Sequence, residues 1–449
     1  MVVLSRVLTG TALVLLWLAP AQAESLYHAM AIAYDSNPTL NAQRAATRAN
    51  DENLTQAISG FRPQVFATAD AAINDSSVSG TTYPYGYGIN IQQSLFNGFR
   101  TINNVKAAKA GIEVSRQTLC NVEQNTLLTV VNAYVGVLRA QELLQIRRRN
   151  ISFLDEQLRS SQARLDVGEG TRTDVAQSRA QLSLARAQLS AAQADLGSAQ
   201  AQYRQAVGRE PRQLRWPPVP TRLVPPSVSE TTRIATRNHP VVRASEFAAD
   251  AASFNVKVAE GAFLPTVTGQ LSANKRYNAG GIQGNDISTS EARVDVRIPL
   301  YQGGSASSTV RQNKQVFSQR RIEIDVQRDS IRQEAVAAYT LMTSARANLK
   351  ANSLQLSAAN LALAGVVEER NVGQRTQLDV LLAQNSVLQA EELRVQSRAS
   401  EIIAAYRVIA ATGKLHSKRL GLKVAHYNPK KHLNAVKDKW LGLRTPSGQ

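Results

Sequence analysis

The feature that most limits how this chain can fold is an internal duplication that covers most of its 449 residues. Residues 60–65 (GFRPQV) resemble residues 262–267 (AFLPTV) at an offset of 202, and residues 95–98 (LFNG) resemble residues 300–303 (LYQG) at an offset of 205. The second offset is then kept by Tyr134 with Tyr339, Gly168 with Gly373, Asp174 with Asp379, and Gly208 with Gly413. One three-residue insertion between residues 265 and 300 accounts for the change. The chain is therefore predicted to contain two copies of one structural unit.

The duplication sets the predicted domain boundaries. The first repeat spans residues 24–210 and the second spans residues 231–413. Residues 211–230 join them and are too rich in proline for a helix, so an extended linker is predicted there. Residues 414–449 form a basic C-terminal tail. The tail could pack near the equator of the helical part or remain mobile, and a partly ordered tail is favoured.

Residues 1–23 have the pattern of a secretory signal peptide. Arg6 supplies the positive charge, residues 7–19 form an apolar run, and Ala21-Gln22-Ala23 precedes the expected first mature residue, Glu24. This run is shorter than the roughly 20 residues that span a bilayer as a helix, and an uncleaved anchor is the alternative. No later apolar run is long enough for a transmembrane helix, whereas transmembrane β-strands need only about 10 alternating residues.

Each repeat contains two segments with the alternation of β-strands, at about residues 63–73 and 84–96 and at about residues 264–276 and 289–301. In the first repeat Tyr85, Tyr87 and Ile89 alternate with small and polar residues. In the second, Val294 and Val296 alternate with charged residues. Such strands suit a sheet with lipid on one side and water on the other. A half-buried hairpin of a soluble protein is the alternative that the same alternation permits.

Long helical hairpins are predicted at about residues 101–208 and 305–412. Residues 101–166 contain no proline and keep helical spacing of their apolar positions, and a helix of that length spans about 100 Å. The returning helix carries a heptad row, which indicates coiled-coil packing: Val175, Leu182, Leu189, Leu196, Tyr203. A purely fibrous coiled coil is the alternative, but it does not account for the strands.

Four strands in one chain cannot close a barrel, and lipid does not tolerate the open edges of a sheet. If the strands enter a membrane, the chain must therefore form an oligomer. Two chains would give an eight-stranded barrel, and side chains fill the interior of a barrel that size. Three chains would give a 12-stranded barrel, which begins to leave a lumen. A homotrimer with a 12-stranded barrel, continued by a helical coiled-coil tunnel, is the predicted assembly.

Composition argues against several other classes. The formal net charge is +18, but nine Lys and Arg residues against one Asp in the tail supply much of it, and an exported protein is not expected to bind nucleic acid. Cys120 is the only cysteine and is expected to be a buried small side chain. Since no ligand spacing for a metal, phosphate-binding glycine loop or nucleophile–base motif is found, no catalytic residue, cofactor or metal is predicted.

The order of elements, the duplication and two turn segments resemble the TolC family of outer-membrane efflux proteins. The segments are residues 168–182 (GEGTRTDVAQSRAQL) and 373–388 (GQRTQLDVLLAQNSVL), and the resemblance runs from Glu24 to about Gly413. It implies a mainly α fold with a membrane β-barrel part, acting as the passive exit duct of a tripartite efflux pump or type I secretion system. It also implies a periplasmic adaptor protein and an inner-membrane transporter as partners, outer-membrane lipid around the barrel, and drugs or proteins as exported substrates.

The glycine turns at Gly168, Gly170 and Gly373 lie at the helix ends farthest from the strands, so they are predicted to be the periplasmic tips. In the family these tips close the channel. The resemblance places gate contacts at the following positions of this chain: Thr173, Asp174, Arg370, Arg375.

The resemblance further implies a link from Asp174 to Arg375 and an acidic pore constriction at Asp379, where threefold symmetry brings three carboxylates together. Arg370 replaces a family tyrosine, and Leu382 stands where the family can carry a second acidic residue. Capping of the following helices is the alternative role of both aspartates. Asp379→Ala is expected to weaken cation selectivity and Arg375→Ser to loosen the closed tip.

Two other classes of protein compete with the export channel. A non-conducting structural coiled-coil protein of the envelope shares the long helices but has no use for lipid-facing strands. A periplasmic adaptor also has long helical hairpins, but it needs a lipoyl-like β-domain that two amphipathic hairpins do not supply. The exit duct is therefore the leading prediction.

Overall fold

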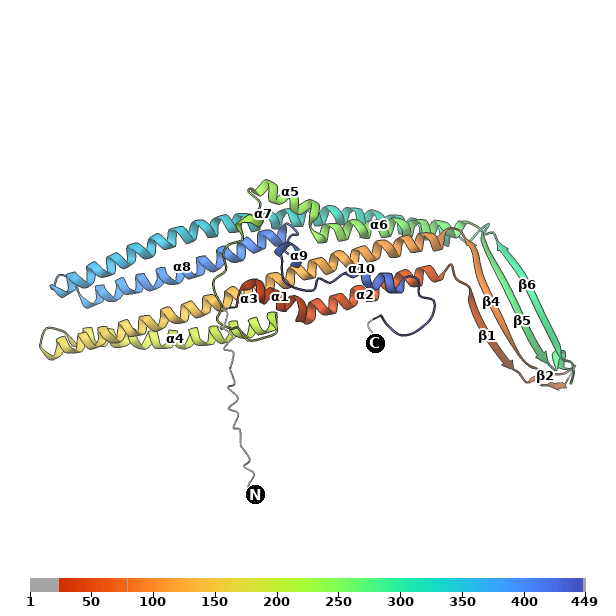
Figure 1. Cartoon of the computed structure of the whole chain (residues 1–449), viewed down its shortest axis with the longest axis horizontal. Helices are drawn as coiled ribbons and strands as arrows, with labels where there is room; N and C mark the ends of the chain where they lie inside the picture. Colours follow the sequence, from red (N-terminus) through yellow and green to blue (C-terminus); the bar gives the residue numbers. More distant parts are fainter. Residues whose placement is uncertain (1–23, 79, 447–449) are drawn as a thin grey trace, which may run out of the picture.

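The structure is a computed structural model that describes residues 24–78 and 80–446, so the predicted signal peptide, residues 1–23, lies outside the described part. Long helices run side by side along the chain and end in two hairpin tips, while a β-sheet bends away from the opposite end (Figure 1). The strands and the glycine turns thus lie at opposite ends of the molecule.

Both repeats contain the same elements in the same order. The first repeat consists of α1 (Leu26–Ser36), α2 (Pro38–Ser59), β1 (Gln64–Ala71), β4 (Tyr85–Asn97), α3 (Arg100–Asp166) and α4 (Arg172–Val207). The second consists of α5 (Val228–Asn238), α6 (Pro240–Glu260), β5 (Thr266–Tyr277), β6 (Ile287–Arg297), α7 (Ser305–Asn371) and α8 (Gln377–Ala411). Two short strands, β2 (Asn74–Ser76) and β3 (Gly80–Thr82), pair at the far end of the first hairpin. Since α3 and α7 each have 67 residues, each spans about 100 Å.

Helix starts are built alike in the two repeats. Proline is the first residue of both α2 and α6, where its missing amide hydrogen costs nothing. The Asn37 side chain accepts hydrogen bonds from the backbone at the start of α2, and His239 Nδ1 accepts one from Val241 N at the start of α6. Burial lowers the pKa of His239 to about 4, so its imidazole is neutral and able to accept.

The four long strands form one antiparallel sheet in the order β1-β4-β5-β6. Their register joins the apolar sides of all four strands into one face: Val65 lies opposite Ile91, Ile91 opposite Leu271, and Leu271 opposite Ala292. The predicted division into an apolar and a polar face therefore continues across the repeat boundary. Strands β1 and β6 are the two unpaired edges of the sheet within one chain.

Glycines on the polar face make room for long side chains from the neighbouring strand. A Cβ atom on Gly88 would lie 1.9 Å from Asn274 Oδ1, so a larger residue there requires the Asn274 side chain to move. Two residues farther along the strands, Arg276 reaches across Gly86 and forms an ion pair of 3.0 Å with Asp70. The polar face is thus tied together across β4.

The last strand, β6, ends at Arg297, four residues before the predicted end. Pro299 lacks an amide hydrogen, which interrupts strand pairing, and the chain then turns into α7. Leu300 and Tyr301 accordingly lie outside the sheet and are almost fully exposed. Strand β1 is also shorter than predicted, since residues 72 and 73 separate it from β2.

One helix, α3, is by length and composition apolar enough to cross a membrane, which corrects the prediction that no such segment follows residue 23. Its most apolar window has a mean hydropathy of 1.2 and is 56% buried inside the chain. Leu127, Val131 and Tyr134 of this helix are buried with Met30 of α1 and Tyr203 of α4 in the central core. The apolar composition of α3 is therefore explained by packing between helices.

The linker and the tail pack beside the middle of the long helices (Figure 1). The Tyr134 hydroxyl donates to the Glu24 carbonyl oxygen (2.6 Å) and accepts from Arg215 N (3.1 Å), which fixes the start of the described chain and the linker to α3. In the tail, α9 (Ser417–Leu420) and α10 (Pro429–Val436) lie against the first repeat. The contact of α10 includes His432 Nδ1, 3.1 Å from the buried Asp51.

Cys120 was predicted to be buried, but its side chain is exposed on α3. Leu119, the preceding residue, is buried in the core, whereas Cys120 lines an open cavity beside the C-terminal tail.

Candidate functional site

The two helical tips have the same turn. In each, a glycine with a left-handed backbone follows the long helix: Gly168 has φ of +82°, and so does Gly373. A residue with a Cβ atom is strained in this conformation, so glycine ends each long helix and lets the chain reverse. Gly170 has an ordinary φ but stands close to the backbone of Leu165.

Both returning helices begin with a capping box. Asp174 N donates to Thr171 Oγ1 (3.1 Å) and Thr171 N donates to Asp174 Oδ2 (3.1 Å). The same reciprocal bonds join Thr376 and Asp379, at 3.2 and 2.9 Å. The two predicted aspartates thus have the capping role that the sequence left open, and this role fixes where each carboxylate lies.

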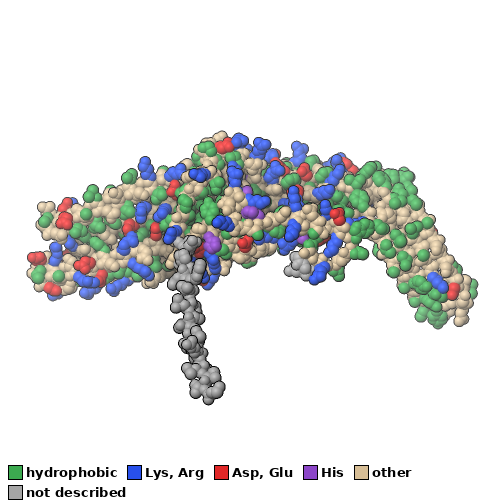
Figure 2. Space-filling model, in the orientation of Figure 1, with side chains coloured by type: hydrophobic (Ala, Val, Ile, Leu, Met, Phe, Trp, Pro, Cys, Tyr) green, Lys and Arg blue, Asp and Glu red, His purple; other side chains and the backbone are tan. Residues whose placement is uncertain are grey.

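The Asp379 carboxylate is held in its charged form. The backbone amide and the hydroxyl of Thr376 both bond to it, and Arg375 adds a favourable charge, so the pKa of Asp379 lies below the usual aspartate range. Acidic side chains gather around both tips, in contrast with the basic middle of the chain (Figure 2).

Arg370 joins the two helical hairpins of the chain close to the tips. Its Nη1 donates to Gln157 Oε1 of α3 (2.8 Å) and to Gln377 Oε1 of α8 (3.0 Å), and its Nη2 donates to Asn371 Oδ1 (2.9 Å). The side chain is 9% exposed, and no carboxylate among the described residues forms an ion pair with it. Burial lowers the pKa of Arg370 below the usual arginine range, and the like charge of Arg164 adds to this.

Further contacts between α3 and α8 continue this seam toward the middle of the molecule. Leu381 of α8 is buried against Leu154 of α3, and Gln384 Nε2 donates to Asn150 Oδ1 (3.1 Å). Ion pairs follow at 2.9 Å between Arg149 and Glu391 and at 2.6 Å between Arg147 and Glu392. The two helical hairpins of one chain are thus held together from the tips toward the middle of the molecule.

Arg375 does not contact Asp174 within the chain. Its Nε lies 2.8 Å from Glu369 Oε2, across the turn of the same hairpin, and this ion pair is solvent-exposed. The predicted link between Asp174 and Arg375 is therefore not made within one chain. Thr173 and Leu382 are exposed at the tips.

Sequence reasoning missed several residues of the site. The capping threonines Thr171 and Thr376 were readable from the spacing of a threonine three residues before an aspartate, which is a helix-start signature. Gln157 gave no such signal, because a glutamine inside a long polar helix looks like any solvated residue. Only the packing of α3 against α8, beside the end of α7, brings it to Arg370.

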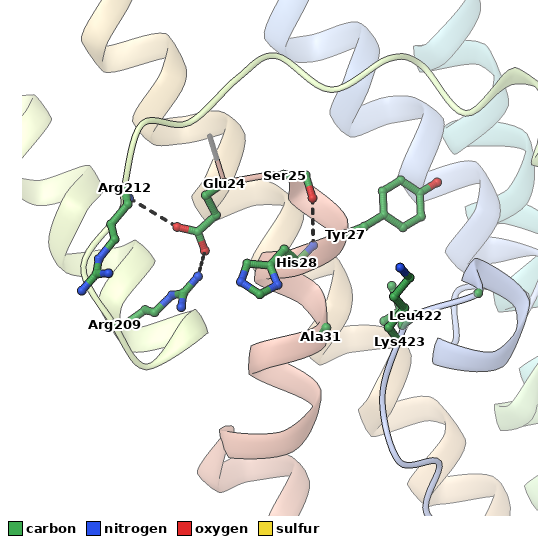
Figure 3. A pocket seen from close by; sticks show the side chains of 10 residues that line it. Glu24, Ser25, Tyr27, His28, Ala31, Arg209, Arg212, Leu422 and Lys423 are labelled. Carbon is green, nitrogen blue, oxygen red and sulfur yellow. Dashed lines mark hydrogen bonds and ion pairs between the residues drawn. The ribbon is translucent and has the colours of Figure 1, made fainter. Parts of the chain in front are cut away.

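A second feature lies at mid-length, where a cavity of about 610 Å³ separates the start of α1 from the tail. Figure 3 shows the Glu24 carboxylate pointing to Arg209 and to the backbone of Arg212, with Lys423 across the gap. The distance from Arg209 Nη2 to Glu24 Oε1 is 2.6 Å, and the Glu24 side chain is 2% exposed. The carboxylate is thus neutralised inside the chain, and it fixes the end of the first repeat to α1. Among residues 24–78 and 80–446, no cluster of three or more His, Cys, Asp or Glu side chains is placed to hold a metal ion.

Comparison with known proteins agrees with this architecture. A family model described as "Outer membrane efflux protein" matches residues 30–209 and 232–414, one segment in each repeat. The chain is 42% identical over 443 residues to the outer membrane efflux protein BepC of Brucella suis, with 99% of this chain and 95% of that protein covered. It is 25% identical over 417 residues to the outer membrane protein TolC of Vibrio cholerae, with 90% and 95% covered.

Among solved structures, the CmeC outer membrane channel of Campylobacter jejuni has a TM-score of 0.79 to this chain. The match covers 92% of this chain and 89% of that one, at 15% sequence identity, so it shows the shared fold alone. Because the family model matches both repeats and a relative 42% identical matches nearly the whole length, the chain belongs to the outer membrane efflux proteins of the TolC family and is an outer-membrane exit duct.

Proposed function

We propose that three copies of this chain form one continuous duct, with a 12-stranded barrel in the outer membrane and a helical tunnel in the periplasm that closes at its tips. The observation that carries this proposal is the four-stranded sheet with one continuous apolar face and two unpaired edges, β1 and β6. Pairing of β6 with β1 of the next copy removes every edge, which a lipid environment requires.

In the proposed trimer each helical hairpin contacts the other hairpin of its own chain and a hairpin of the next chain. These two contact surfaces, here called seams, differ at the tip. Within a chain, Arg370 bonds to Gln157. At the matching positions of the other repeat, 205 residues away, stand Leu165 and Ala362, which cannot form this bond. We therefore assign the tip lock to the seam inside each protomer, and the tip opens when this seam parts. An Asp174–Arg375 pair between neighbouring chains is the second candidate lock, since both side chains are at the tips and the pair is absent within a chain.

We assign the narrowest ring of the closed tip to Asp379. Its capping bonds fix the carboxylate at the start of α8 and keep it charged. Three such carboxylates around a threefold axis favour cations over anions.

Asp379→Asn is expected to reduce cation selectivity in reversal-potential measurements, because it removes the charge while an amide oxygen can still accept the Thr376 amide hydrogen. Asp174→Asn is the matched control, since it alters the equivalent capping box of the first repeat. Equal selectivity changes in the two variants would show that the ring is not at Asp379.

For partners, we propose a periplasmic adaptor protein and an inner-membrane transporter that meet the helical tips. The long helices support this, because a tunnel of about 100 Å reaches far into the periplasm. The family is one of channels, and we propose no catalytic step. Exported drugs and exported proteins are both compatible with the duct.

Single-channel recording of the detergent-purified protein in a planar bilayer tests the proposed duct. Small, stable, cation-selective openings are expected from a closed acidic tip. A monodisperse trimer that gives no conductance, even after Arg370 is replaced, would instead favour the non-conducting structural coiled coil.

A further inference from the structure

A second cavity, of about 250 Å³, lies where the tail crosses the first repeat. Its walls come from α1, α2, α3 and the tail, with Tyr34, Arg44, Arg116, Cys120 and Tyr427 among the lining residues. It is separate from the helical tips and from the cavity beside Glu24, and the transport mechanism makes no use of it.

Three residues that line this cavity have buried donor atoms without hydrogen-bond partners in the described part of the chain. Arg44 Nη2, Arg116 Nε, Arg116 Nη2 and the Tyr427 hydroxyl are buried, and none of them has a hydrogen-bond partner among the described residues. A buried donor without a partner destabilises the folded chain, and more so when it is charged. Four such atoms belong to three residues of the cavity lining, so an acceptor group bound there would satisfy them after a small movement of these side chains.

The charge of the lining selects an anion. Arg44, Arg116 and Lys418 line the cavity together with one carboxylate, Glu123, and Arg116 Nη1 is also paired with Glu113 outside the lining. That carboxylate already accepts a hydrogen bond from Ser417 N at 2.7 Å. Burial lowers the pKa of His416, another lining residue, so its imidazole is neutral near pH 7 and adds no charge. The cavity thus has a net positive charge.

Arg44 is held in place before any ligand arrives. Its guanidinium carbon lies 4.4 Å from the ring centroid of Tyr34 and 5.5 Å from that of Tyr427, so the group sits between two aromatic rings. Its Nη1 donates to Asn41 Oδ1 (2.8 Å), which leaves Nη2 as the free donor. A guanidinium fixed in this way loses little side-chain entropy on binding an oxyanion.

We propose that this cavity binds a small diffusible oxyanion of the phosphate type, which joins Arg44 of α2 and Arg116 of α3 to Tyr427 of the tail. Phosphate presents several acceptor oxygens, and it suits the planar donors of arginine. Bound there, the anion stabilises the packing of the tail on the first repeat.

A lipid headgroup carries the same chemistry, but the position of the cavity disfavours it. Arg44 lies 16 residues before Gly60, where α2 has ended and the chain turns toward β1. At 1.5 Å per residue this places Arg44 about 24 Å along the helix from the sheet, which is the part expected to contact lipid. A free anion reaches this depth of the periplasm, whereas a headgroup stays at the membrane surface.

The test is calorimetric titration of the full-length, detergent-purified protein with sodium phosphate, against sodium chloride of matched ionic strength. Saturable binding of phosphate is expected. Arg44→Gln and Arg116→Gln are each expected to raise the dissociation constant at least tenfold. Arg48→Gln, one turn farther along α2 and outside the cavity, is the matched control and should change it less than twofold.

Cys120 provides a local readout, because it is the only cysteine and lines this cavity. Bound phosphate is expected to slow its alkylation by the neutral reagent iodoacetamide several-fold at constant pH, in the native chain but not in Arg44→Gln. Binding that Arg44→Gln leaves unchanged, or no binding beyond that of chloride, would overturn the proposal. Protection of Cys120 in phosphatidylglycerol nanodiscs but not by inorganic phosphate would assign the cavity to a lipid headgroup and would equally overturn it.

Discussion

Replacing Arg370 with serine is expected to open the closed tip, raising the single-channel conductance or the open probability. The change removes the three hydrogen bonds that the charged Arg370 side chain donates, to Gln157 of α3, to Gln377 of α8 and to its neighbour Asn371. Hydrogen bonds to charged groups contribute about 1.5–3 kcal/mol each, but relief of the buried guanidinium offsets part of this. We therefore expect a shift of about tenfold in the closed-to-open equilibrium per protomer, the factor that corresponds to ~1.4 kcal/mol.

Gln157→Ala removes the acceptor on α3 from the same bond. If the bond acts as a lock, the double variant should differ little from Arg370→Ser alone, since both changes remove one interaction. Additive effects would show that the two residues act separately.

The matched comparison is Arg375→Ser, which breaks an exposed ion pair with Glu369 inside one turn. Exposed pairs contribute little to stability, so a smaller effect than that of Arg370→Ser is expected. The reverse order would move the lock to the seam between protomers, where an Asp174–Arg375 pair is the candidate.

Replacing Ile89 with arginine is expected to abolish assembly in the outer membrane. Ile89 is exposed on the apolar face of β4, in the middle of the sheet, between Ala67 and Ala273. Arginine facing lipid near the bilayer midplane costs about 2–4 kcal/mol, and a trimer carries this cost three times. The readout is the amount of protein in the outer-membrane fraction that migrates as a trimer on a gel without heating.

Asn90→Arg is the control for this prediction. Asn90 is the next residue of β4, so its side chain lies on the opposite, polar face of the sheet. Normal assembly of this variant is expected, because an arginine there faces a water-filled lumen. Equal loss of both variants would mean that the two faces are not divided between lipid and water.

Much of the fold was readable from the sequence because it rests on local and periodic signals. Strand alternation separated the face of Tyr85, Tyr87 and Ile89 from its opposite, and the register of the sheet joins that face to Leu271 of the second repeat. Glycines at the tips marked the reversal of the chain, since both Gly168 and Gly373 adopt the left-handed backbone. These features depend on residues near one another in the chain.

Predictions that depended on distant contacts were less accurate. Cys120 follows the buried Leu119, and helix spacing around it did not decide which of the two faces the core. The apolar window in α3 escaped the search for membrane helices, and its burial depends on α1, α4 and α8. Arg375 has its partner in the same turn, at Glu369, because the short turn brings them together before any second hairpin is involved.

By itself, the sequence determined the duplication, the order of elements and the positions of the tip turns, because each is encoded by spacing within a few residues or by the offset between repeats. Only the tertiary structure decided which polar side chains meet. Arg370 and Gln157 are 213 residues apart in the chain, and Arg44, Arg116 and Tyr427 come from three separate segments. No local sequence pattern specifies such contacts, because they follow from how long helices align when their apolar faces are buried together.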